Sequence, residues 1–160
     1  MSRPPPSQHF EHNGRRVAWR EYGSGPRVVV LLHGLLMDGT MFVKLGPELA
    51  ARGYRVLTVD LPGHGESGVV RDMTAHSMTL YGQDVIALLD HLNIPQAVVG
   101  GTSLGANVSL EVAVAAPDRV RALLVEMPVL ENGLAGAGAL FVPLAFAIRI
   151  NRRGMNLLAA

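Results

Sequence analysis

The amino-acid sequence predicts an α/β fold with a mostly parallel central sheet flanked by helices. Three runs rich in apolar residues, 28–32, 54–59 and 120–127, resemble strands buried on both faces, as strands of a parallel sheet usually are. A shorter run at 97–99 is a fourth strand of this kind. Segments with helical spacing of apolar residues separate these runs, and this alternation favours parallel strands joined by right-handed crossovers.

The chain is expected to begin with an antiparallel hairpin over residues 8–22. Asn13-Gly14 is the strongest short signal for a hairpin turn, because both residue types accept the positive φ that a two-residue turn requires. Residues 1–7 contain a run of prolines, and we predict that they form a disordered, polyproline-like tail.

Helices are predicted between the strands. Pro47 suits the first turn of a helix that ends before Gly53, since proline is favoured at helix starts and glycine at helix ends. Apolar residues recur at helical spacing over 85–92, and Pro95 follows the end of this pattern. A third helix is expected over residues 104–116, after a glycine-rich turn.

The composition excludes several classes of function. The 160 residues suit one domain, and 49% apolar with 17% charged residues allows a substantial core. The net charge of +1 predicts no basic face, so nucleic acid is not an expected partner. Cysteine is absent, which excludes disulfides, thiolate metal sites and a cysteine nucleophile, and which fits a cytoplasmic location.

Residues 133–148 carry no charge and are about as long as a short transmembrane helix. Pro143 and several glycines interrupt the stretch, and arginines follow it. We therefore expect no membrane span and favour a buried helix or a lid helix.

Residues 97–107 predict a strand, a very tight turn and a helix. Ser103 lies between Gly101 and Gly105 in a G-x-S-x-G pattern, which is typical of a turn that presents a nucleophilic serine. The residues two before and two after such a serine lie against neighbouring backbone, where only a very small side chain fits. The first N–H groups of the helix, including that of Leu104, can stabilise a developing oxyanion.

Four short segments occur in one order along the chain, each beside a predicted strand. They are LLHG at 31–34, DLPGHGES at 60–67, GTSLG at 101–105 and PDRV at 117–120. Together they closely resemble the α/β-hydrolase superfamily, in the branch of esterases, C–C bond hydrolases and haloperoxidase-like enzymes. The resemblance covers residues 10–127, and it implies about six of the eight strands of that fold.

The resemblance implies that Ser103 is the catalytic nucleophile of a hydrolase acting on a small ester-like or related acyl substrate. The oxyanion hole would consist of the backbone N–H groups of Leu35 and Leu104. A serine at this position disfavours the dehalogenase and epoxide-hydrolase relatives, because those have an aspartate there. Four further residues would shape the site: His33, Gly34, Gly101 and Gly105. No cofactor or metal is expected, because the histidines do not lie at ligand spacing and no G-x-G-x-x-G motif follows a strand.

The family mechanism also needs a histidine and an acid after the serine, and no histidine follows Ser103. Glu126 and Glu131 flank the end of the last predicted strand and are candidates for the acid, although the resemblance favours a position after a further strand that these 160 residues do not contain. His33 and His64 are alternatives for the base, although the family has both histidines for structural reasons. Three other histidines are expected to face solvent: His9, His12 and His91.

The simplest interpretation is that the chain is the N-terminal part of a longer hydrolase. Residues 8–128 would form the core, and 129–160 would begin a cap segment over the serine. The strand at 120–127 would then be an exposed edge that could mediate self-association. The alternative is a catalytically inactive fragment or a non-catalytic binding module, because the base is missing from the chain and the acid is not identified.

Overall fold

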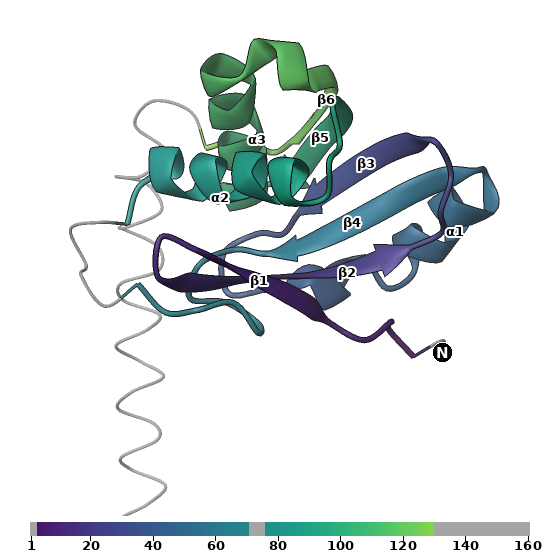
Figure 1. Cartoon of the computed structure of the whole chain (residues 1–160), viewed down its shortest axis with the longest axis horizontal. Coiled ribbons are helices and arrows are strands. Elements are labelled where there is room, and N and C mark those ends of the chain that lie inside the picture. The colour runs from purple at the N-terminus through teal and green to yellow at the C-terminus, as the bar shows by residue number, and fades with distance from the viewer. Residues whose placement is uncertain (1–2, 71–75, 130–160) are drawn as a thin grey trace, which may run out of the picture. The chain divides into compact units, whose positions relative to one another are not determined.

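The computed structural model describes residues 3–70 and 76–129 (Figure 1). The sheet has six strands in the order β1-β2-β4-β3-β5-β6. In chain order the strands are β1 (Gln8–His12), β2 (Arg15–Tyr22), β3 (Arg27–Leu32), β4 (Tyr54–Asp60), β5 (Ala97–Thr102) and β6 (Val120–Glu126). The helices are α1 (Leu45–Ala51), α2 (Met78–His91) and α3 (Leu104–Ala115), with the short 3-10 helices η1 (Gly39–Phe42) and η3 (Pro117–Arg119).

The pairing of the strands confirms the predicted fold class. β1 and β2 form an antiparallel hairpin, and β2 is also antiparallel to β4. The pairs β3–β4, β3–β5 and β5–β6 are all parallel. The hairpin turns at Asn13 and Gly14, whose φ angles of 49° and 71° fit the turn that the Asn-Gly pair predicts.

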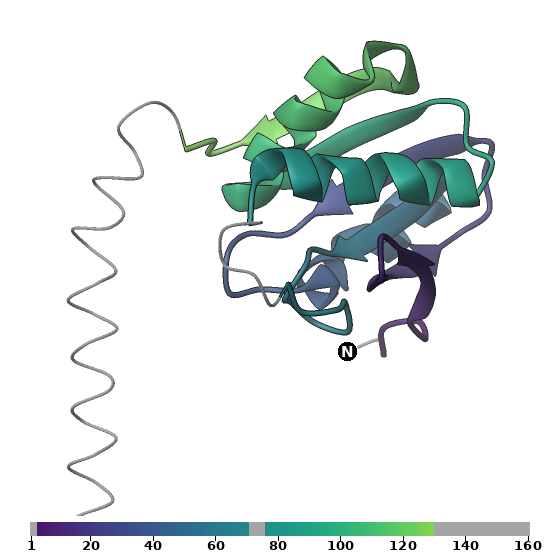
Figure 2. The same ribbon diagram turned by 60° about the vertical axis from the view of Figure 1, so that its left-hand side comes forward.

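Helices cover both faces of the central strands. Figures 1 and 2 show α2 and α3 next to one another on one side of the sheet, where Val30 and Leu32 belong to the larger core cluster. On the other side, Val29 and Leu31 pack in a second cluster with residues of α1. Successive residues of β3 therefore alternate between two cores, which explains its unbroken apolar sequence.

β6 differs from the other parallel strands because it lies at the end of the sheet. Leu124 is 51% exposed, and Met127, just after the strand, is 69% exposed. The apolar sequence at 120–127 predicts a strand buried on both faces, and this prediction is wrong for the described part of the chain. The reason is that no described segment pairs with the outer edge of β6.

One compact unit ends at Pro128, and a second unit spans Val129–Ala160. Apart from Val129, the second unit lies outside the described residues, and so do the predicted cap segment, the uncharged stretch at 133–148 and Glu131. Within residues 3–70 and 76–129, no helix is long and apolar enough to cross a bilayer.

Candidate active site

The parallel strands bring three of the sequence motifs to one edge of the sheet. β3, β4 and β5 are parallel neighbours, and Leu32 is in register with both Val59 and Gly101. Their carboxyl ends therefore lie side by side, and the segments that follow them, which begin at His33, Leu61 and Ser103, share this carboxyl edge.

Ser103 occupies a strained turn between β5 and α3. Its φ and ψ are 54° and −112°, a conformation that a residue with a side chain rarely adopts. A Cβ atom at Gly101 would lie 2.4 Å from the carbonyl oxygen of Leu32, and one at Gly105 would lie 2.0 Å from the same oxygen. The turn thus packs so closely against β3 that both flanking positions accept only glycine.

Two backbone N–H groups lie next to this serine. Leu104 is the first residue of α3, so its N–H has no partner within the helix. Gly34 passes beside the turn, because a Cβ atom there would be 3.9 Å from the Ser103 Cβ, and Leu35 follows it directly. In the described part of the chain, neither the Leu35 N–H nor the Leu104 N–H donates a hydrogen bond. Both donors are thus available to an oxygen bound at Ser103.

Glu126, at the end of β6, fixes the turn from its other side. The Ser103 N–H donates to the Glu126 carbonyl oxygen at 2.9 Å. The Thr102 hydroxyl donates to the Glu126 carboxylate at 2.6 Å. The candidate acid Glu126 is therefore held next to the serine turn by a side-chain and a backbone contact.

His33 is fully buried, and both of its ring nitrogens form hydrogen bonds. Nε2 accepts from the Leu61 N–H at 2.9 Å, so the proton is on Nδ1, which donates to the Gly34 carbonyl oxygen at 2.8 Å. Burial lowers the pKa of His33 below its ordinary value. The neutral imidazole joins the loops after β3 and β4, and it has no nitrogen left to accept the Ser103 proton.

His64 lies beside His33, with the two ring centroids 5.0 Å apart. Its Nδ1 is 3.0 Å from the Pro62 carbonyl oxygen, to which it donates. Nε2 has no partner among the residues that the structure describes. His64 is therefore the histidine of this edge that keeps a ring nitrogen available.

Asp60 connects the same two loops through a buried carboxylate. Oδ1 accepts from the Gly39 N–H at 2.7 Å, and Oδ2 accepts from the Glu66 N–H at 2.9 Å. Arg20 is 7% exposed and lies 3.2 Å from Oδ2. Arg20 could not be identified from the sequence, because it alternates with Val17 and Trp19 along β2 and so lies on the opposite face of the strand from these two core residues.

The remaining histidines differ in their surroundings. His9 and His91 are exposed, and the His91 ring stacks on Phe10. The prediction that His12 faces solvent is wrong, because it is half-buried with Nδ1 2.6 Å from a carboxylate oxygen of Asp84. Asp84 is itself buried and also pairs with Arg15, so this cluster fastens the hairpin to α2.

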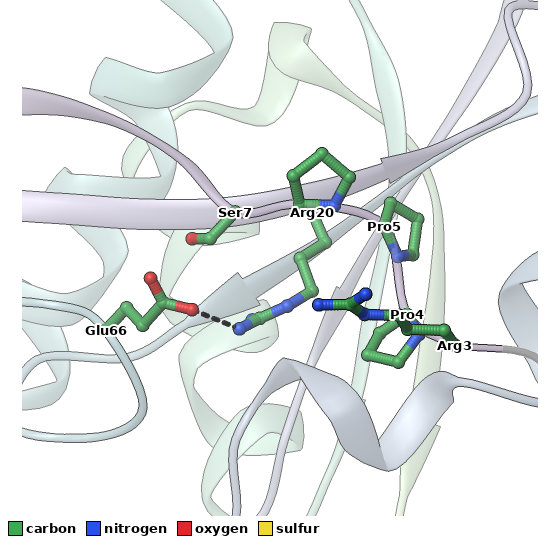
Figure 3. Close-up of a pocket in the computed structure, with 7 residues that line it drawn as sticks. Arg3, Pro4, Pro5, Ser7, Arg20 and Glu66 are labelled. Atoms are coloured by element: carbon green, nitrogen blue, oxygen red, sulfur yellow. Dashed lines mark hydrogen bonds and ion pairs between the residues drawn. The ribbon is translucent and has the colours of Figure 1, made fainter.

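One cavity formed by the described residues does not include Ser103 in its lining. A space of about 430 Å³ lies between the N-terminal segment and β2, where Figure 3 shows Arg20 paired with Glu66. Its lining comprises Arg3, Pro4, Pro5, Pro6, Ser7, Arg20 and Glu66. No group of three or more histidine, aspartate or glutamate side chains suited to a metal ion occurs within the described ranges.

Comparison with known proteins identifies the family. Residues 27–142, well over half of the chain, match the family described as the alpha/beta hydrolase fold. The chain belongs to this family, as the ordered motifs predict.

The relatives are considerably longer than this chain. It is 42% identical over 120 residues to the dihydrolipoyllysine-residue acetyltransferase component of an acetoin cleaving system from Pseudomonas putida, covering 74% of this chain and 32% of that protein. It is 34% identical over 132 residues to a 2-hydroxy-6-oxononadienedioate/2-hydroxy-6-oxononatrienedioate hydrolase from Cupriavidus pinatubonensis, covering 81% and 44%. An epoxide hydrolase from Vigna radiata superposes with a TM-score of 0.70 at 26% identity, covering 74% and 38%. The chain thus spans less than half the length of each.

Proposed function

We propose that the chain carries the nucleophile and the oxyanion hole of a serine hydrolase that acts on a small ester-like or related acyl substrate. The observation that supports this most directly is the backbone of Ser103, with φ of 54° at the turn between β5 and α3. Strain at a non-glycine residue is retained where a function requires it. A strand-to-helix turn of this kind presents the serine hydroxyl at the top of the sheet.

In the proposed reaction, Ser103 Oγ attacks the acyl carbonyl carbon and its proton passes to a general base. The carbonyl oxygen becomes an oxyanion that accepts hydrogen bonds from the N–H groups of Leu35 and Leu104. The N-terminus of α3 adds a partial positive charge at the same place. Collapse of the intermediate breaks the bond to the leaving alcohol, which takes the proton, and water then hydrolyses the acyl-serine.

The base and the acid are the open elements of this proposal. The hydrogen bonds of His33 argue against it as the base. The two alternatives are His64, whose Nε2 is available, and a histidine from outside the 160 residues. For the acid we favour Glu126, because its carboxylate is held by Thr102 beside the nucleophile.

Labelling with a fluorophosphonate probe tests this proposal, since the probe reacts only with an activated serine. The purified chain is compared with Ser103→Ala and with the exposed-turn variant Ser24→Ala as control. With His64 as the base, we expect labelling of the chain and of Ser24→Ala, and none of Ser103→Ala. Loss of labelling in His64→Gln would identify His64 as the base. Absence of labelling in a chain that circular dichroism shows to be folded would contradict an active serine within the 160 residues.

The second candidate function is a non-catalytic binding module of the same fold. One observation favours it: both ring nitrogens of the buried His33 are occupied by hydrogen bonds, so this histidine has no nitrogen available for a proton from Ser103. This candidate would be supported over the hydrolase if the folded chain is not labelled by the probe but binds a small ester reversibly without hydrolysing it.

Further features of the proposal concern the chain as a whole. We propose a cytoplasmic location, which the absence of cysteine fits, and self-association through the edge of β6. We also propose a disordered tail at 1–7, a core at 8–128 and the beginning of a cap at 129–160. Limited proteolysis tests this division, and cleavage is expected first within 1–7 and 129–160.

A further inference from the structure

A second cavity lies at the amino edge of the sheet, opposite the edge that carries Ser103. Its volume is about 360 Å³, which is within the range of about 300–1,000 Å³ that is typical of small-molecule sites. Arg27 and Tyr54 begin β3 and β4 and are in register with one another, and both line the cavity. Gln96 and Arg121 line it from just before β5 and from the start of β6.

The charged lining of this cavity is entirely positive. Arg27 and Arg121 form no ion pair within residues 3–70 and 76–129, and no acidic side chain lines the space. Four other described arginines have carboxylate partners, namely Arg15, Arg20, Arg55 and Arg119, whereas Arg3, Arg16 and Arg52 form no ion pair among the described residues but do not line this cavity. The two guanidinium groups in the cavity are therefore available to an anion, and their charges reinforce one another there.

Arg27 is also held in place. Its guanidinium carbon lies 4.3 Å from the centre of the Tyr54 ring, a cation–π contact. Stacking uses the flat face of the guanidinium and leaves the N–H donors at its rim free for a ligand. Gln96 is oriented as well, since its side-chain amide donates to the Asp118 carbonyl oxygen at 3.0 Å.

We propose that this cavity binds a small phosphate monoester. Arg27 and Arg121 would hold the phosphate, because the guanidinium fork matches phosphate oxygens and two cations without an acid favour a doubly charged group. The cavity has room for about ten water-sized molecules, which is far more than a phosphate ion needs. The organic part of the ligand would lie on the apolar side chain of Val98, which also lines the space.

NMR titration of the full chain with phenyl phosphate tests the site, with inorganic phosphate as a parallel titration. Arg27→Gln and Arg121→Gln are compared with Arg52→Gln, which removes an exposed arginine outside the cavity. We expect saturable shifts of the cavity residues, and a Kd for phenyl phosphate that rises about tenfold in each cavity variant and stays unchanged in the control. Tighter binding of phenyl phosphate than of inorganic phosphate supports an organic ligand, whereas equal affinity assigns the site to free phosphate.

Two results would overturn the site itself. One is the absence of saturable shifts up to about 10 mM phenyl phosphate. The other is unchanged affinity in Arg27→Gln and Arg121→Gln, with amide spectra that show both variants to be folded. Because the cavity and Ser103 lie at opposite edges, neither result bears on the labelling of the serine.

Discussion

The backbone N–H of Leu61 donates to Nε2 of the buried His33 at 2.9 Å. This bond joins the loop after β3, which carries the proposed oxyanion donor Leu35, to the loop after β4. It requires a neutral imidazole, because a protonated His33 would place two N–H groups against one another. The loop geometry at the carboxyl edge thus depends on the protonation of a residue that does not touch the reacting atoms.

Acid is therefore expected to destabilise the fold through His33. Burial lowers its pKa in the folded chain, while in the unfolded chain the pKa is about 6.5. Between these two pKa values the unfolded chain binds more protons than the folded chain. The contribution of His33 to the free energy of unfolding is therefore fully present above the unfolded-state pKa, and it is lost as the pH falls toward the folded-state pKa. The slope contributed by this residue is at most about 1.4 kcal/mol per pH unit.

Urea unfolding at several pH values between about 7.5 and 5.5, the range around the pKa of a free imidazole, measures this effect. The His33→Gln variant is expected to be less stable at neutral pH, with a flatter pH dependence. The two proteins differ only at residue 33, so the difference between their pH profiles reports on the replacement of His33. Parallel pH profiles in the two proteins would contradict the prediction.

Removing Arg20 is expected to cost both stability and the order of the oxyanion loop. Arg20→Met leaves the Asp60 carboxylate buried without its cation, and breaking a buried ion pair in this way costs about 3–5 kcal/mol. Arg16→Met, on the same strand but exposed, is the matched control. Chemical denaturation measures the loss, and Arg20→Lys should restore part of it. Equal stability of Arg20→Met and Arg16→Met would show that the pair contributes little.

Gly105 is expected not to tolerate alanine. Its Cβ would lie 2.0 Å from the Leu32 carbonyl oxygen, a backbone atom, so the turn or β3 must shift at a cost of about 1–3 kcal/mol or more. At Gly34 the nearest atom to a Cβ would be 3.6 Å away, so Gly34→Ala serves as the control and should keep its stability. The midpoint of denaturant unfolding distinguishes the two variants.

β6 is expected to drive self-association of the chain. Sedimentation velocity across a range of protein concentrations should show assembly that Leu124→Lys suppresses, since charged side chains on an edge strand oppose pairing. Val114→Lys replaces another large exposed apolar residue, 80% exposed on α3, and should leave the assembly unchanged. A chain that stays monomeric at all concentrations would exclude this role for β6.

Much of the fold could be predicted because its signals are local. Asn13-Gly14 encodes the hairpin turn, and the apolar run of β3 indicates burial on both faces. Interactions between distant segments gave no such signal: the pair of His12 with Asp84 joins residues far apart in the chain, and so does the pair of Arg20 with Asp60.

The candidate site likewise combines features with a local sequence signal and features that depend on contacts between distant segments. The position of Ser103 is readable from two glycines and a strand, because steric demands at a tight turn restrict the sequence locally. The hydrogen bonds that occupy His33 depend on Leu61, which reaches it only through the pairing of β3 and β4. The exposure of β6 was not predictable either, because an apolar strand sequence does not say which segment covers it.

The two edges of the sheet are unlike, and this limits the symmetry of any assembly. β1 is short and mostly polar, with the sequence QHFEH, whereas β6 carries Leu123, Leu124 and Val125 in succession, all at least 36% exposed. Contact between unlike edges would repeat head to tail into an open filament, while contact between two β6 strands closes around a two-fold axis. The polar β1 edge is a poor partner for β6, so self-association through β6 is expected to close as a pair rather than to extend as a filament.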